Sequence, residues 1–136
     1  SLARQQPKAT ERSVMKDAKL DVIVKAIDLM QYTLTITSNR KRYPVKHLIL
    51  IRRIQERCMD IYENLLNANR LHVVNFKQER LNLQTKAISC CDQLSCYVEI
   101  SMKMNLIGMK TVEYWQKQIE DVKYMTIAWR SKDQKR

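Results

Sequence analysis

The sequence has a single glycine and two prolines among its 136 residues. One glycine cannot build a Walker loop or a G-x-G-x-x-G turn, so nucleotide binding through either motif is excluded. A series of β-hairpins, which need glycine-containing turns, is disfavoured for the same reason. Hydrophobic residues make up 45% of the chain, which argues against disorder. Because Leu, Ile, Lys, Glu, Gln, Met and Arg dominate and favour helices, we predict an all-α fold.

Long apolar segments are also missing. No uncharged run approaches the roughly 20 residues that a membrane-spanning helix needs. The start of the chain lacks the apolar core of a signal peptide. We therefore expect a cytoplasmic protein.

Motifs that hold metals or perform catalysis are absent as well. The two histidines, His47 and His72, are far apart, and no C-x-x-C pair accompanies the four cysteines. A structural zinc site requires clustered ligands. We expect reduced thiols, no metal and no cofactor. With no HExxH and no readable grouping of histidine, carboxylate and nucleophile, we also predict that the protein is not an enzyme. The cysteines are Cys58, Cys90, Cys91 and Cys96.

Apolar residues recur every three or four positions and predict four helices. The first is expected from a cap at Thr10 or Ser13 to about Ser38, and the second from Pro44 to about Asn69. Asn75 and Gln78 resemble a capping box at the start of the third helix. This helix is expected to end before a short turn over 105–108, with Asn105 as a left-handed cap. Short connections make neighbouring helices antiparallel, which predicts an up-down-up-down four-helix bundle over residues 13–132. Residues 1–12 are predicted to form a basic flexible arm and residues 133–136 a basic tail.

Each helix has one apolar stripe that is expected to face the core. The stripes are Leu20, Ile23, Ile27, Met30 and Leu34; Leu48, Ile51, Ile54, Cys58, Ile61, Leu65 and Ala68; Leu83, Ala87, Cys90, Leu94, Tyr97, Ser101 and Met104; and Val112, Trp115, Ile119, Val122, Thr126 and Trp129. Trp115 is therefore interpreted as a core residue. Further apolar residues lie off these stripes, and they fit either a wide core face or a contact between subunits. They are Leu50, Met59, Tyr62, Leu66, Ile88, Val98 and Met102.

Positive charge is concentrated in two segments. Residues 40–57 contain seven basic residues and one acid, Glu56, whereas residues 130–136 contain four basic residues and Asp133. Together they carry nine of the eleven net positive charges. Concentrated charge of this kind can bind a polyanion. In the bundle, the two segments lie at opposite ends, so a side-by-side assembly would join each end into a ring of positive charge.

The first segment is unfavourable for local helix stability. Cations at a helix N-terminus oppose the helix dipole, yet no acid appears between residue 40 and Glu56. Free N–H groups and basic side chains together can bind anions, and arginine matches phosphate geometry. Arg52 is expected to pair with Glu56 at a spacing of four. The simpler alternative is a solvated basic surface. The predicted nucleic-acid contacts are Arg40, Lys41, Arg42, Lys46, Arg53 and Arg57.

The C-terminal cations are weaker candidates. Basic residues at a helix C-terminus are favoured by the dipole, so stability explains them as well as function does. Arg130 and Lys132 are therefore predicted as second-rank nucleic-acid contacts.

Several short stretches occur in an order that is typical of one protein family. They are Asn39-Arg40-Lys41-Arg42-Tyr43-Pro44, Arg53-Ile54-Gln55, Asp60-Ile61-Tyr62-Glu63-Asn64, Ala68-Asn69, Glu113-Tyr114-Trp115 and Ala128-Trp129, followed by basic residues. Over about residues 18–132 the chain resembles the four-helix-bundle family that includes the accessory variability determinant proteins of diversity-generating retroelements. The same family includes proteins encoded in intervening sequences of large-subunit ribosomal RNA genes.

This resemblance implies a basic pentameric ring of bundles that binds RNA or DNA. It also implies a partnership with the reverse transcriptase of the retroelement, supporting mutagenic synthesis of complementary DNA. Two other functions stay open: binding of structured ribosomal RNA, and an adaptor role in which the basic surface meets an acidic protein.

Overall fold

The computed structural model describes residues 21–136. In that range four α-helices and one short 3-10 helix occur and no strand is present. The elements are a first helix, described over residues 21–37, then η1 (Val45–His47), α2 (Leu48–Arg70), α3 (Lys77–Lys103) and α4 (Met109–Lys135). The predicted all-α bundle is confirmed. The predicted arm over 1–12 and the caps at Thr10 or Ser13 lie outside the described residues.

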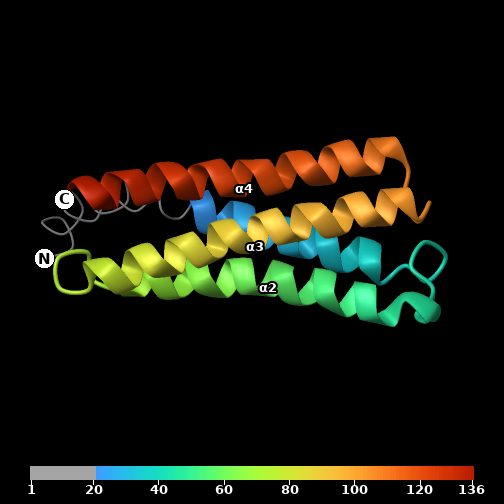
Figure 1. The fold of residues 1–136 in the computed structure, drawn as a ribbon, viewed down its shortest axis with the longest axis horizontal. Helices are drawn as coiled ribbons and strands as arrows, with labels where there is room; N and C mark the ends of the chain where they lie inside the picture. Colours follow the sequence, from blue (N-terminus) through green and yellow to red (C-terminus); the bar gives the residue numbers. More distant parts are fainter. Residues whose placement is uncertain (1–20) are drawn as a thin grey trace, which may run out of the picture.

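The helices pack in an antiparallel ring. In Figure 1, α2, α3 and α4 run side by side with their connections at alternating ends. α3 packs against both α2 and α4. The first helix contacts α2, where the Gln55 amide donates to the Thr37 hydroxyl at 3.0 Å. It also contacts α4, where the Trp115 indole nitrogen donates to the Thr33 hydroxyl at 3.0 Å. The C-terminus and the turn after the first helix therefore lie at opposite ends, as predicted.

The predicted core stripes of α2 and α4 are buried almost completely. On α2 the stripe from Ile51 to Ala68 is buried, and only Leu48 at its start is exposed. All six stripe residues of α4 are buried. Trp115 is fully buried, which confirms it as a core residue.

The stripe of α3 is buried only in part. Ala87, Cys90, Leu94 and Ser101 are buried, whereas Met104 is exposed. The remaining two members, Leu83 and Tyr97, are partly buried.

The first helix buries a face that overlaps only in part with the predicted one, because Met30 and Leu34 of the predicted stripe are only partly buried. Ile23 is buried as expected, but Ile27 is 40% exposed, and Leu20 lies outside the described residues. Threonines take part of the expected place because their hydroxyls are satisfied inside the helix and bundle. The Thr37 hydroxyl donates to the Thr33 carbonyl at 2.7 Å, and the Thr33 hydroxyl accepts from Trp115. Besides Ile23, the buried residues are Val22, Ala26, Leu29, Thr33 and Thr37.

The additional apolar residues mostly widen the core. Val98 is buried, and five others are partly buried, whereas Met59 is 44% exposed. A wide core face therefore accounts for all of them except Met59. The partly buried residues are Leu50, Tyr62, Leu66, Ile88 and Met102.

The two ends of α3 differ in how well the sequence predicted them. Asn105 has φ 60°, and the N–H of Leu106 donates to the Ser101 carbonyl at 3.0 Å. This pattern confirms the left-handed cap. The capping box is wrong, because α3 begins at Lys77 and no side chain caps it. The preceding loop is closed instead by His72, whose Nδ1 accepts the N–H of Val74 at 3.3 Å.

The predicted basic tail is also wrong. α4 continues through Lys135, and Asp133 is buried within it. The helix is held to its end because Asp133 forms an ion pair with Arg80 of α3 at 2.7 Å. Across residues 21–136, none of the helices combines the length and apolar character needed to cross a membrane.

Candidate nucleic-acid interface

One end of the bundle is formed by two turns and the helix ends beside them, residues 38–50 and 100–112, here called the turn end (Figure 1). These two segments contain six basic residues and no acid. Charges that are separate in the sequence therefore converge, because antiparallel packing brings both turns to the same end. The basic residues are Arg40, Lys41, Arg42, Lys46, Lys103 and Lys110.

Lys103 and Lys110 were missed by the sequence analysis because each is isolated along the chain. The predicted antiparallel topology could have identified them. It places the turn over 105–108 at the same end of the bundle as the basic turn over 39–43. Lys103 is close to Glu99, with 3.9 Å between Nζ and the carboxylate, and both side chains are exposed. Such a surface pair neutralises little.

Arg42 connects the two turns directly. Its guanidinium donates to the Thr111 hydroxyl of α4 at 3.2 Å. Arg42 also lines an open depression of about 510 Å³ together with residues 105–111. The first turn of α4 contains no acid. An anion in this depression would meet Arg42, Lys110 and the free N–H groups of the α4 N-terminus.

Arg40 has a structural role in the turn. Its Nη1 donates to the Thr37 carbonyl at 3.0 Å and to the Tyr43 carbonyl at 3.2 Å, which closes the end of the first helix. The Asn39 carboxamide oxygen accepts the N–H of Lys41 at 3.0 Å, and the Tyr43 side chain is fully buried. The backbone of the turn is thus fixed at both sides, which sets the positions from which its cations extend.

The basic face of α2 is partly neutralised. Glu56 accepts from Arg53 at 3.4 Å and lies 3.5 Å from Arg57. Arg57 is also 3.5 Å from Asp60. Two cations therefore face two carboxylates, and the positive charge of this region is concentrated at the turn end.

The expected pair between Arg52 and Glu56 is wrong. Arg57 is held beside Glu56 because it also donates to Gln93 of α3 at 3.3 Å. Arg53 approaches Glu56 from the preceding turn of the helix. Among the described residues Arg52 has no ion pair, and its side chain is exposed.

The second-rank residues Arg130 and Lys132 belong to the last two turns of α4, and this helix ends at the other end of the bundle (Figure 1). Arg130 is half-buried, and its Nε donates to the Leu81 carbonyl at 3.3 Å. Lys132 is exposed. The structure therefore does not bring these two residues to the turn end.

The thiols are not arranged as a site. All four cysteines are free, and only Cys96 is exposed. Burial raises the pKa of Cys58 to about 11 and that of Cys91 to about 12, so both stay protonated at neutral pH. Between residues 21 and 136, no group of three or more His, Cys, Asp or Glu residues is placed to hold a metal ion.

The fold and its charge define a small basic four-helix bundle. A crystal structure at 1.70 Å of a protein of unknown function from the S23 ribosomal protein family of Bacteroides thetaiotaomicron is similar to it. The TM-score is 0.62 at 14% sequence identity, and the match covers 88% of this chain and 96% of that chain. At this identity the likeness establishes a shared fold. No family model matches the chain, and no curated protein has a matching sequence.

Proposed function

We propose that this protein is a cytoplasmic, non-catalytic accessory protein of a diversity-generating retroelement. In this role it binds nucleic acid and associates with the reverse transcriptase that copies template RNA into mutated complementary DNA. The observation that carries nucleic-acid binding is the turn end, where six cations from two turns meet with no acid in either segment. The retroelement role is supported by the family resemblance of residues 18–132.

The chemistry of the turn end fits phosphate better than a base edge. Lysine and arginine on a fixed turn bind phosphates through charge, and release of counterions drives the binding. Within residues 21–136, no helix or ribbon projects from this end as a groove-reading element (Figure 1). Contacts of this kind position a nucleic acid without reading its sequence, so we expect low base specificity.

A pentameric ring is part of the proposal. Met59 is exposed on the α2 flank that also carries Gln55, whose side chain contacts the first helix. An apolar side chain at that position supports lateral contact between bundles, which would join the turn ends into one basic ring. Analytical ultracentrifugation of the wild-type protein is expected to give five times the 16.2 kDa chain mass. A monomeric mass would contradict the ring.

Binding of structured ribosomal RNA is the second candidate function. It is favoured by the shared fold with the crystal structure from the S23 ribosomal protein family. An adaptor for an acidic protein rests on charge alone. Salt dependence alone does not separate nucleic acid from an acidic protein, because both contacts are electrostatic and weaken as salt rises. Direct binding of a labelled RNA separates them.

The turn end is tested by charge reversal. We expect Lys41→Glu with Arg42→Glu to weaken binding of a labelled RNA in filter assays and to flatten the dependence of affinity on salt. The matched control, Lys86→Glu with Lys117→Glu, makes the same charge change at exposed positions along the middle of the bundle. Equal losses in both variants would show that only net charge matters.

Partnership with the polymerase needs its own measurement. The tagged protein is mixed with the reverse transcriptase encoded beside it, after nuclease treatment, and retention is scored. We expect the polymerase to be retained. We also expect mutated complementary DNA to form only when both proteins are present. Absence of a neighbouring reverse-transcriptase gene, together with selective binding of ribosomal RNA, would favour the second candidate.

A further inference from the structure

The end of the bundle opposite the turn end is also basic. It is formed by residues 69–78, which include the α2–α3 loop, and by residues 130–136 of α4, here called the terminal end (Figure 1). The two segments touch where the Lys77 ammonium donates to the Gln134 carbonyl at 2.9 Å. They contain six basic residues and one acid, Asp133, and the exposed Glu79 follows directly in the first turn of α3. The basic residues are Arg70, Lys77, Arg130, Lys132, Lys135 and Arg136.

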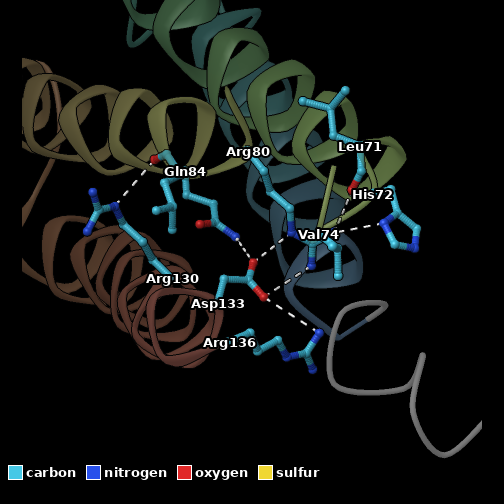
Figure 2. A network of polar contacts seen from close by, with 9 residues as sticks. Leu71, His72, Val74, Arg80, Gln84, Arg130, Asp133 and Arg136 are labelled. Carbon is cyan, nitrogen blue, oxygen red and sulfur yellow. Dashed lines mark hydrogen bonds and ion pairs between the residues drawn. The ribbon is translucent and has the colours of Figure 1, made fainter. Parts of the chain in front are cut away.

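The one acid of the terminal end does not reach its surface. Asp133 is 1% exposed and pairs with Arg80, which is 2% exposed, at 2.7 Å. Figure 2 shows its carboxylate between Arg80 and Gln84, whose amide donates to it at 2.8 Å. The carboxylate charge is therefore compensated inside the bundle. Arg136 lies 3.9 Å from the same carboxylate, and the other five cations of this end have no ion pair with Asp133.

The same network fixes the loop. Arg80 donates to the Leu71 carbonyl at 2.9 Å, and its guanidinium lies 5.0 Å from the centre of the Trp129 ring. The N–H of Phe76 donates to the His72 carbonyl at 2.9 Å, and the Phe76 carbonyl accepts the backbone N–H of Arg80 at 3.0 Å. Because hydrogen bonds fix both ends of the loop, its backbone holds the outward-facing residues in defined positions.

Two of those outward side chains are apolar. Val74 is 73% exposed and Phe76 is 47% exposed. Phe76 directly precedes Lys77, which is bonded to the C-terminal turn of α4. An exposed aromatic ring among cations is the combination by which proteins hold unpaired bases, with stacking on the ring and phosphates on the cations. A duplex would offer phosphates but no free base face.

We propose that the terminal end binds a single-stranded segment of nucleic acid, with a base stacked on Phe76 and phosphates held by Lys77, Lys132 and Lys135. This inference rests on the proposed function, that the protein binds nucleic acid, and assigns a second surface at the other end of the bundle. The turn end binds phosphates of any strand, whereas the terminal end selects unpaired bases.

Fluorescence anisotropy with two labelled probes tests the stacking. One probe is an unstructured single strand, and the other is a hairpin with the same number of phosphates. We expect Phe76→Ala to weaken single-strand binding at least about fivefold, the lower range of a stacked base, and to leave hairpin binding unchanged. Val74→Ala, which removes a more exposed apolar side chain from the same loop, is expected to match wild type. Phe76→Trp is expected to restore single-strand binding.

Charge reversal at each end separates this inference from the proposed function. Lys132→Glu with Lys135→Glu is expected to weaken single-strand binding. It should also reduce the slope of log affinity against log salt concentration by about 0.7 for each phosphate contact that is lost. If Lys41→Glu with Arg42→Glu weakens binding while Phe76→Ala and the C-terminal variant bind as wild type, the inference fails and the turn end stands. The opposite result is also possible: Phe76→Ala and the Lys132→Glu, Lys135→Glu variant weaken binding, and the Lys41→Glu, Arg42→Glu variant does not. In that case the turn end is not the binding surface, and the inference about the terminal end holds.

A membrane surface is the competing occupant, because cations around exposed apolar residues also bind anionic lipids. Sedimentation with vesicles of phosphatidylserine and phosphatidylcholine measures it. Loss of vesicle binding in Phe76→Ala with unchanged single-strand affinity would overturn the proposal. Circular dichroism melting confirms that each variant remains folded, and the half-exposed position of Phe76 predicts that it does.

Discussion

Arg80 and Asp133 form an ion pair that is buried in the bundle, with 2.7 Å between Nε and the carboxylate (Figure 2). The pair joins the first turn of α3 to the last turn of α4, which are 53 residues apart in sequence. It also ties α3 to the preceding loop through the Leu71 carbonyl. One interaction therefore closes this end of the bundle and removes the acid of the C-terminal segment from the surface.

Asp133→Asn is expected to destabilise the protein by about 3–5 kcal/mol, because it leaves the buried charge of Arg80 without a partner. Chemical denaturation followed by circular dichroism measures the loss. The control is Arg80→Met combined with Asp133→Leu, which removes both charges and keeps apolar volume. That double variant is expected to lose much less stability than Asp133→Asn. Equal losses would show that packing, and not the unpaired charge, dominates.

Arg40 and Lys41 are neighbours that should separate stability from binding. Arg40→Ala removes two hydrogen bonds to carbonyls at the end of the first helix, so we expect about 1–2 kcal/mol of lost stability. Lys41 has no side-chain bond among the described residues, and Lys41→Ala is expected to weaken nucleic-acid binding and leave the melting temperature unchanged. A variant of Arg40 that melts as wild type would contradict the capping role.

Arg53 and Arg57 test how far the interface extends along α2. Both already face Glu56, and Arg57 faces Asp60 as well. We expect Arg53→Glu with Arg57→Glu to reduce filter binding less than Lys41→Glu with Arg42→Glu does. Glu56→Gln is the complementary variant: it frees Arg53, leaves Arg57 paired with Asp60 alone, and is expected to strengthen binding. A larger loss from the α2 variant would place the main contact on the helix face.

Apolar periodicity predicted the fold because α2 and α4 have unbroken stripes. It failed on the first helix, where Thr33 and Thr37 are buried with satisfied hydroxyls. A pattern that counts apolar residues omits such threonines, and it assigns Ile27 to the core although Ile27 is 40% exposed. The position of the core in that helix depends on a partner, Trp115 of α4, that only tertiary structure supplies.

The candidate site was predicted in part for a similar reason. Local charge density found the turn over 40–42, but not Lys110, which joins it only through folding. A count of charges along the sequence treats Asp133 as a surface acid. In the structure Asp133 is buried, because it pairs with Arg80. Pairing of this kind cannot be read from spacing, since Arg80 lies in another helix. The sequence predicts where charge is concentrated, and packing decides which charges reach solvent.

The buried thiols are expected to make the free energy of unfolding fall at alkaline pH. Burial raises the pKa of Cys58 to about 11 and that of Cys91 to about 12, whereas an unfolded cysteine has a pKa of about 8.5. The unfolded chain therefore releases these protons first, so the stabilisation is fully present below about pH 8.5 and is lost as pH rises toward 11–12. Urea unfolding at a series of pH values should show stability falling above about pH 9.

Thiol labelling checks the same burial independently. At pH 8 a disulfide reagent is expected to modify only the exposed Cys96 in the folded protein, and all four cysteines in denaturant. Cys96→Ser should abolish the rapid native reaction without changing the alkaline loss of stability, because that loss comes from the buried thiols. Cys58→Ala with Cys91→Ala should reduce the alkaline slope instead. Rapid labelling of more than one thiol in the native protein would contradict the buried arrangement.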